Sequence, residues 1–224
     1  MTKVKICGIT EVFYAQAAIE AGADLIGVVF APSPRQVTYG KAREIVAAVK
    51  KYNLPVVGVF VNMPAATVNT AASLCGLDWV QLSGDETWEY CQQIEKPVIK
   101  AIHISSRWGE DELLAHLENG QRMLGSRSPI YLLDTFVEHQ YGGTGQVFAW
   151  EIAKRAAVKY PVIIAGGLHP RNAAQVVARL RPWGVDVSSG VESEGVKDVD
   201  KIKAFVQAVR SVHNSATEGG TVRC

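Results

Sequence analysis

The sequence predicts a single α/β domain, a (β/α)8 TIM barrel in which eight parallel strands alternate with helices. Short β-branched runs alternate with stretches of helical periodicity along the chain, which is the pattern of repeated βαβ units. Eight such units follow one another without a linker or a change in composition, and this favours a closed barrel over an open doubly wound sheet. The length of 224 residues also suits one domain of this fold.

The expected strands are short β-branched runs bounded by turn residues. They cover Val4 to Gly8, Leu25 to Phe30, Val56 to Val61, Trp79 to Leu82, Val98 to Ile102, Ile130 to Asp134, Val162 to Ala165 and Val185 to Val187.

Helices are expected between these strands, and apolar residues at i, i+3, i+4 spacing mark the face that each helix turns to the core. In the last helix this stripe consists of Val199, Ile202, Phe205, Val206 and Val209. The expected helices include Glu11 to Ala21, Lys41 to Lys51, Glu110 to Glu118, Phe148 to Val158, Asn172 to Leu180 and about Val199 to Val212.

Glycines and polar stretches indicate where elements end. Gly22, Gly76 and Gly120 fall where helices should stop, because glycine is preferred just past a helix C-terminus. From Ser215 onwards the chain is polar and contains glycine. We therefore expect a barrel domain over residues 1–212 and a flexible C-terminal tail over 213–224.

Composition excludes several other classes of protein. The formal net charge is +1 and the basic residues are scattered, which argues against a nucleic-acid partner. No apolar run approaches the roughly 18 to 20 residues that span a bilayer, and the N-terminus does not resemble a signal peptide. The four cysteines and five histidines show no metal-binding or disulfide spacing, so a cytoplasmic protein with a small-molecule substrate and no metal is expected, as a monomer or a homodimer.

Two polar side chains stand at the ends of expected strands, where the active sites of such barrels lie. Cys7 ends the first strand and Asp134 ends the sixth. Side-chain alternation places Lys5 and Cys7 on the face toward the barrel interior. Cys7 could simply be a small buried hydrophobe, and Asp134 could cap the turn after it. An acid and a base across the barrel mouth favour proton transfer, with the thiolate stabilised by a nearby cation.

Small residues after the seventh and eighth strands indicate a phosphate site. Gly166 and Gly167 follow one strand, and Ser189 and Gly190 follow the other. These two loops form the recurrent phosphate site of (β/α)8 barrels, since glycine lets backbone N–H groups approach an anion closely. The alternative is that the glycines only make tight turns.

Two further loops carry candidate residues. Arg35 lies in a proline-containing loop after the second strand, which suits a bidentate grip on a carboxylate, although a solvated arginine is the alternative. The loop from Thr135 to Val147 contains Gly142 and Gly143 and is longer than usual, so it is expected to be a mobile lid or a spacer.

Several motifs occur in a fixed order between about Lys3 and Arg210. Each is weak alone, but together they resemble the phosphoribosylanthranilate isomerase family. The motifs are Lys5 to Thr10, Ser33 to Arg35, Gly58 to Asn62, Val80 to Leu82, Leu132 to Thr135 with Gly142 to Gly145, Ala165 to Leu168, and Asp186 to Glu192.

The resemblance implies an enzyme of tryptophan biosynthesis that acts without a metal or a redox cofactor. Its reaction would be the Amadori rearrangement of N-(5-phosphoribosyl)anthranilate to 1-(2-carboxyphenylamino)-1-deoxyribulose 5-phosphate, the third step of the branch from chorismate. Asp134 would protonate the furanose oxygen as general acid, and Cys7 would remove the proton from sugar C2 as general base. Arg35 would hold the anthranilate carboxylate. The backbone around Gly166, Gly167, Ser189 and Gly190 would hold the phosphate.

The chain departs from the family pattern at two positions. Ser83 stands where the family usually has histidine, and Ala149 stands where it often has aspartate. These departures are the only support for a different class, a non-catalytic barrel that senses a metabolite. A third possibility is the related aldose isomerase of histidine biosynthesis, but that reaction would be expected to place an aspartate at Cys7.

Barrel closure also predicts a buried ion pair beneath the mouth. The first and eighth strands become neighbours, and Lys5 and Asp186 each lie two residues below a mouth residue, Cys7 and Ser188. We expect their charged groups within about 4 Å of each other.

Overall fold

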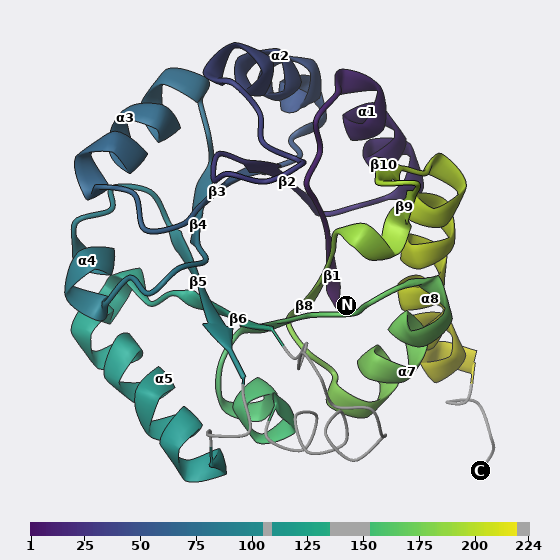
Figure 1. The fold of residues 1–224 in the computed structure, drawn as a ribbon. Coiled ribbons are helices and arrows are strands. Elements are labelled where there is room, and N and C mark those ends of the chain that lie inside the picture. Colours follow the sequence, from purple (N-terminus) through teal and green to yellow (C-terminus); the bar gives the residue numbers. More distant parts are fainter. Residues whose placement is uncertain (105–108, 135–152, 219–224) are drawn as a thin grey trace.

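The computed structural model describes residues 1–104, 109–134 and 153–218 and confirms the (β/α)8 barrel. Eight parallel strands close in sequence order, with β1 hydrogen-bonded to both β2 and β8, and helices surround them (Figure 1). The observed strand ends agree with the expected ones to within one residue. The strands are β1 (Lys3–Cys7), β2 (Leu25–Val29), β3 (Val56–Phe60), β4 (Trp79–Leu82), β5 (Val98–His103), β6 (Ile130–Asp134), β7 (Val162–Ala165) and β8 (Gly184–Val187).

The helices follow the expected order, with α5 and α8 longer than expected. Residues 153–159 are helical and overlap the expected helix from Phe148 to Val158, whose first residues lie outside the described chain. Helix α8 continues to Glu218, and the tail residues 219–224 are likewise outside it. The helices are α1 (Val12–Ala21), α2 (Tyr39–Val49), α3 (Ala65–Cys75), α4 (Trp88–Gln92), α5 (Glu110–Leu124), α7 (Pro170–Leu180) and α8 (Val199–Glu218).

Glycine ends two helices as expected and plays a different role in a third. Gly22 and Gly76 adopt left-handed φ angles of 85° and 68°, which a residue without Cβ adopts at little cost. Gly120 was expected to end a helix, but this prediction is wrong because it lies inside α5. There the helix packs against the Trp88 ring, and a Cβ on Gly120 would come within 2.8 Å of it. Close packing, not a turn, requires this glycine.

The core has two layers separated by the barrel wall. Alternate strand residues point outward against the helices, as Ile6 and Phe60 do, and Phe60 stacks on Phe30 with ring centroids 4.9 Å apart. The remaining apolar strand residues, such as Ile99 and Leu132, fill the barrel interior. Lys5 and Cys7 alternate with Ile6 along β1. Ile6 packs in the outer layer, whereas Lys5 contacts Asp186 and Cys7 packs with Val59, which confirms that Lys5 and Cys7 point inward.

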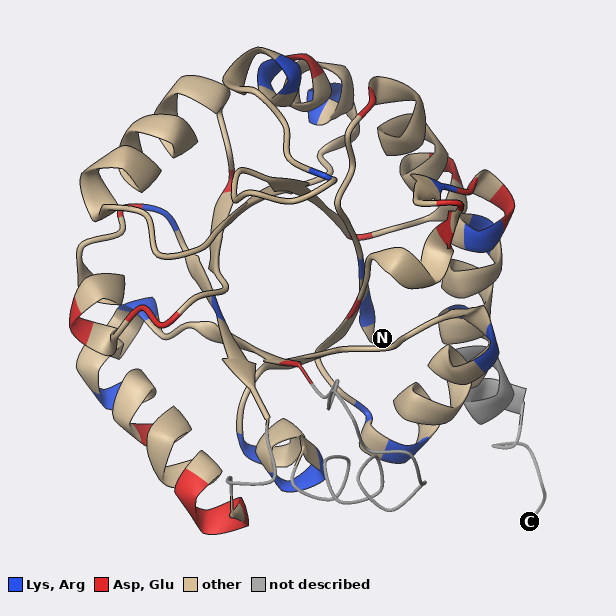
Figure 2. Cartoon of the chain, viewed as in Figure 1, with Lys and Arg blue, Asp and Glu red and all other residues tan. Residues whose placement is uncertain are grey.

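Charged residues are spread around the ring of helices, with both signs interspersed (Figure 2). Within the described residues, no helix is long and apolar enough to cross a membrane. Inside the barrel, however, one charged pair is buried. Lys5 and Asp186 are register partners on β1 and β8, and Lys5 Nζ lies 2.9 Å from Asp186 Oδ1. The predicted interior ion pair is therefore confirmed.

Candidate active site

Cys7 lies at the carboxyl end of β1, inside a small apolar layer formed with residues of β2 and β3. A Cβ placed on Gly27 of the adjacent β2 would meet both Cys7 Sγ, at 2.8 Å, and Lys5 Nζ, at 3.0 Å. Gly27 thus leaves room for the thiol and the ammonium side by side. Lys5 Nζ donates to Asp186 Oδ1 at 2.9 Å and lies close enough to Cys7 to influence its ionisation, so the thiol adjoins the buried ion pair.

The balance of forces on the thiol differs from the sequence-based expectation. Burial raises the pKa of Cys7 above its ordinary value, although the Lys5 and Lys197 ammonium groups act in the opposite direction. The expected cations are present, but the free-energy cost of removing the thiolate from water exceeds the stabilisation that these cations provide. In the ligand-free protein the thiol form is therefore favoured.

Asp134 ends β6, and its side chain is about one-third exposed toward the mouth. Its register partner is His103 at the end of β5, and His103 Nδ1 lies 3.6 Å from Asp134 Oδ2. Hydrogen bonding to Asp134 raises the pKa of His103, against the smaller opposing effect of burial. The sequence analysis did not select His103 as a site residue. Its position at the end of β5, the strand that precedes β6 and Asp134 in the chain, was a sequence feature that indicated it.

The serine at position 83 is part of the same rim. Ser83 Oγ accepts a hydrogen bond from Gln81 Nε2 at 3.0 Å, and its carbonyl oxygen lies 3.1 Å from His103 Nε2. The imidazole of His103, from the neighbouring strand β5, therefore contacts the backbone of Ser83. Ala149, the other departure, lies outside the described residues.

Arg35 is held at the rim by a carboxylate of the protein itself. Its Nε and Nη2 donate to Glu192 Oε1 and Oε2 at 2.7 and 2.6 Å, a bidentate geometry that fixes the guanidinium plane. The Arg35 side chain crosses the end of β1 over Gly8, where a Cβ would approach Arg35 Cδ to 2.5 Å. Hydrogen bonding to Glu192 raises the pKa of Arg35. Arg35 is thus a fixed, partly exposed cation and not a solvated surface residue.

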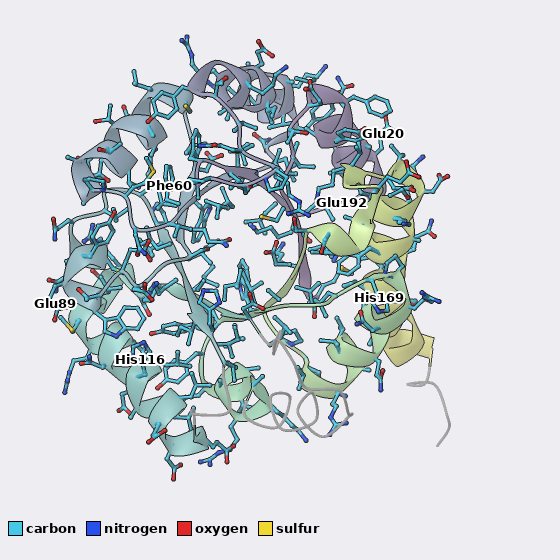
Figure 3. The ribbon with its side chains drawn as sticks, viewed as in Figure 1. Glu20, Phe60, Glu89, His116, His169 and Glu192 are labelled. Atoms are coloured by element: carbon cyan, nitrogen blue, oxygen red, sulfur yellow. The ribbon has the colours of Figure 1, made fainter. Side chains whose placement is uncertain are left out.

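The loops after β7 and β8 pack against each other. Gly166 and Gly167 both adopt positive φ angles, 90° and 63°. Across from them, a Cβ on Gly190 would lie 1.8 Å from the Leu168 carbonyl oxygen. Helix α7 begins just beyond, with His169 as its N-cap (Figure 3). The glycines expected for a phosphate site are therefore brought together.

Two site residues, Glu192 and Lys197, were not selected by the sequence analysis. They belong to β9 (Glu192–Ser193) and β10 (Val196–Lys197), a small hairpin inserted between β8 and α8. Both side chains are almost fully buried, at 5% and 2% exposure. The only sequence signal was a two-residue turn, Glu194 and Gly195, which is weaker than an Asn-Gly turn.

Glu86 and Lys100 support the opposite side of the mouth. Glu86 accepts hydrogen bonds from the backbone N–H groups of Asn62 and Gly84, at 2.7 and 2.9 Å, and pairs with Lys100 Nζ at 3.0 Å. Lys100 also donates to the Gly84 carbonyl oxygen at 2.6 Å. This network ties together the ends of β3, β4 and β5. Its buried polar groups are mutually satisfied, as a structural support requires.

The expected lid residues Gly142 and Gly143 lie outside the described part of the chain. Within that part, the inward thiol, the carboxyl group of Asp134 and the guanidinium of Arg35 all come from the carboxyl ends of strands or the loops after them. This is the end at which (β/α)8 barrels carry their active sites. The fold and the site together define a (β/α)8-barrel enzyme with acid–base groups at its mouth.

Comparison with known proteins narrows this class to one family. A model of the family described as N-(5'phosphoribosyl)anthranilate (PRA) isomerase matches residues 4–208. The N-(5'-phosphoribosyl)anthranilate isomerase of Dehalococcoides mccartyi is 47% identical over 212 residues, covering 94% of this chain and 96% of that protein. The chain belongs to this family.

Two solved structures share the fold over nearly the whole chain. One, of monomers generated from the dimeric phosphoribosylanthranilate isomerase of Thermotoga maritima, has a TM-score of 0.78 at 33% identity, covering 94% of this chain and 100% of that one. The other is an isomerase in complex with reduced 1-(o-carboxyphenylamino)-1-deoxyribulose 5-phosphate. It has a TM-score of 0.76 at 35% identity, with the same coverage. The alternative of a non-catalytic sensor receives no support from these matches.

Proposed function

We propose that the protein catalyses the Amadori rearrangement of N-(5-phosphoribosyl)anthranilate to 1-(2-carboxyphenylamino)-1-deoxyribulose 5-phosphate in tryptophan biosynthesis. Family membership over residues 4–208 supports the reaction. The observation that carries the proposal is the inward position of Cys7 above the Lys5–Asp186 pair, with Asp134 at the end of β6. The reaction needs one proton delivered and one removed, and these two groups can supply both transfers.

Asp134 is the general acid in this proposal. Its protonated carboxyl group donates a proton to the furanose ring oxygen as the bond between that oxygen and C1 breaks. The nitrogen lone pair of the anthranilate then forms the C1=N bond of a Schiff base. His103, 3.6 Å from the carboxylate left behind, is placed to stabilise that negative charge when protonated.

Cys7 is the general base. Its thiolate takes the proton from sugar C2, and the electrons of that C–H bond move toward the Schiff-base nitrogen to give an enolamine. The enolamine tautomerises to the C2 ketone, so the reaction is an isomerisation with no net change in composition. Lys5, whose ammonium borders the same Gly27 position as the thiol, stabilises the thiolate at the moment it is needed.

Arg35 and the paired glycine loops hold the two ends of the substrate. The exposed part of the Arg35 guanidinium binds the anthranilate carboxylate. The backbone N–H groups around Gly166, Gly167, Ser189 and Gly190 bind the phosphate, since two glycine-containing loops at this end of a barrel form its usual anion site. Because Arg35 binds one end of the substrate and the glycine loops bind the other, the sugar is held between Asp134 and Cys7.

Replacing Asp134 with asparagine tests the proposal directly. The substrate is generated in situ from anthranilate and phosphoribosyl pyrophosphate with a separate transferase, and its fluorescence decay is followed. Wild type is expected to accelerate the decay, and Asp134→Asn to lose about 10²-fold or more in kcat, because an amide cannot deliver the proton. Asp200→Asn, an exposed change on α8, is the control. Decay no faster with folded wild type than without protein would rule out the isomerase.

Replacing Gly190 with alanine is expected to disrupt the phosphate site. The new Cβ would lie 1.8 Å from the Leu168 carbonyl oxygen, so the two loops must separate. A displacement of this size is expected to lower kcat/KM by about 10²-fold and to lower the midpoint of thermal unfolding. Gly40→Ala is the matched control, because its nearest neighbour is 3.8 Å away. Equal kinetics for the two variants would contradict the phosphate assignment.

The proposed setting is the cytoplasm, with a small-molecule substrate and either one copy or two copies of the chain in the working enzyme. Free Cys7, Cys75 and Cys91 are compatible with a reducing compartment. The relative from Thermotoga maritima is described as dimeric, which makes a homodimer the first state to test by size-exclusion chromatography with light scattering.

A further inference from the structure

Three charged side chains meet at the rim where β1 and β8 adjoin, and we call Arg35, Glu192 and Lys197 the rim cluster. Glu192 Oε1 accepts from Arg35 Nε at 2.7 Å and from Lys197 Nζ at 2.5 Å, while Oε2 accepts from Arg35 Nη2 at 2.6 Å. Glu192 and Lys197 are buried, and Arg35 is 28% exposed. Arg35 is therefore the member of the cluster that a ligand can reach.

A tight hairpin places the two buried members opposite each other. Glu194 and Gly195 form the turn, with positive φ angles of 52° and 81°, as a two-residue hairpin turn requires. Lys197 is then the register partner of Glu192 across the hairpin. Lys201 of α8 donates to the Glu192 carbonyl oxygen at 2.7 Å and ties the hairpin to the helix. Glu192 lies on the barrel side of α8 (Figure 3).

Lys197 is also in contact with the rest of the mouth. Its Nζ donates to the Ser188 carbonyl oxygen at 2.9 Å, and it lies 3.4 Å from the position of a Cβ on Gly8. Cys7 and Lys197 are close enough to influence each other's ionisation. The ammonium is therefore central to the site, yet its side chain is only 2% exposed, so its role is to act through its neighbours.

The charges of the rim cluster determine how strongly it attracts an anionic ligand, and Lys197 supplies a second cation beside Arg35. Burial alone would raise the pKa of Glu192, but hydrogen bonds from Arg35 and Lys197 hold it below its ordinary value, so Glu192 is a carboxylate. An Arg–Glu pair alone is neutral and attracts an anion weakly. Adding Lys197 gives the cluster a net charge of +1 while Glu192 still fixes the guanidinium. Arginine has five N–H donors, so donors remain for a ligand beyond the two that bind Glu192.

We propose that Lys197 is a positioning and specificity residue: its buried charge balances Glu192, so that Glu192 can orient Arg35 without cancelling its attraction for the substrate's carboxylate. The inference rests on the proposed function, in which that carboxylate belongs to the anthranilate group. It predicts that Lys197 affects binding of carboxylated ligands much more than binding of the same ligands without the carboxylate.

Two ligands and three variants test the charge balance. The ligands are reduced 1-(o-carboxyphenylamino)-1-deoxyribulose 5-phosphate and its phenylamino counterpart without the carboxylate, with affinities measured by calorimetry. Lys197→Met is expected to weaken binding of the carboxylated ligand by about 100-fold, the effect of removing one partner of a buried charge pair, and to leave the other ligand nearly unchanged. Lys197→Arg should retain most of the affinity.

The double variant Glu192→Gln/Lys197→Met restores a cluster charge of +1 through Arg35 alone. It is expected to bind the carboxylated ligand more tightly than Lys197→Met does, a coupling that a double-mutant cycle measures. Circular dichroism and thermal unfolding establish that each variant is folded.

Three outcomes overturn the inference. If Lys197→Met weakens both ligands equally, Lys197 only supports the structure. If the double variant binds no better than Lys197→Met, charge balance is not its role. If wild type catalyses the isomerisation but does not prefer the carboxylated ligand, the rim cluster is not the carboxylate site, although the proposed function stands. Absence of both catalysis and binding in wild type would instead contradict the proposed function itself.

Discussion

Replacing Cys7 with serine is expected to lower kcat/KM for the isomerisation by about 10²-fold to 10⁴-fold, the range for losing a general base. Serine preserves the size of the side chain, but its hydroxyl ionises far less readily than a thiol. The fluorescence decay of substrate generated in situ provides the measurement.

A matched change at another buried thiol separates chemistry from packing. Cys75 lies at the end of α3 and contacts the Tyr39 carbonyl oxygen at 3.7 Å, away from the mouth. Cys75→Ser should leave kcat/KM close to wild type. If Cys7→Ser and Cys75→Ser had equally small effects, Cys7 would not be the base.

The assignment of Cys7 as the general base determines whether kcat/KM increases or decreases with pH. A general base must be deprotonated, and burial raises the pKa of the Cys7 thiol above its ordinary value of 9.0. On the limb set by this group, kcat/KM should therefore increase with pH and level off only above that value. Because kcat/KM reports the ionisation of the free enzyme, a limb that levels off well below that value would mean either that the free thiol ionises at a lower pH than its burial implies or that another group is the base. Alkylation of Cys7 by iodoacetamide across the same pH range reports the thiol pKa in the free enzyme and distinguishes the two.

The second large effect is expected from Lys5→Met. The Lys5 side chain is 1% exposed and pairs with Asp186 at 2.9 Å. Methionine is similar in length but leaves the Asp186 carboxylate buried without its cation. Breaking a buried pair in this way costs about 3–5 kcal/mol, which urea unfolding followed by circular dichroism can measure.

Lys3→Met is the matched control on the same strand. Lys3 also forms an ion pair, with Asp24 at 3.0 Å, but its side chain is 49% exposed. Exposed pairs contribute only about 0–1 kcal/mol. Adding Asp186→Leu to Lys5→Met should recover part of the lost stability, because an apolar pair needs no compensating charge. If Lys5→Met cost no more than Lys3→Met, the interior pair would not be a stabilising element.

Local features of the sequence were sufficient to predict the barrel. Buried parallel strands produce short runs rich in apolar residues, and the runs expected as strands at Trp79–Leu82 and Val162–Ala165 have the same ends in the structure. Closure makes the first and last strands neighbours by necessity. Together with the equal depth of Lys5 and Asp186 below the barrel mouth, it predicted their contact, 181 positions apart in the chain. The inward position of Cys7 followed from the two-residue period of a strand.

Other features depended on contacts that no local pattern records. Gly120 looked like a helix end, but the indole of Trp88, from a different helix, is what excludes a Cβ there. Arg35 was expected to meet a carboxylate of the substrate, and the structure adds a carboxylate of the protein, Glu192, 157 positions away.

The sequence by itself determined the barrel, the strand ends that carry Cys7 and Asp134, and the ion pair beneath the thiol. All of these follow from side-chain periodicity and chain closure. Only the tertiary structure decided how the site is charged. Burial raises the pKa of Cys7 against nearby cations, and a short hairpin brings Lys197 and Glu192 to Arg35. Desolvation and ion pairing depend on the distances between residues remote in the chain, and those distances exist only once the barrel has closed.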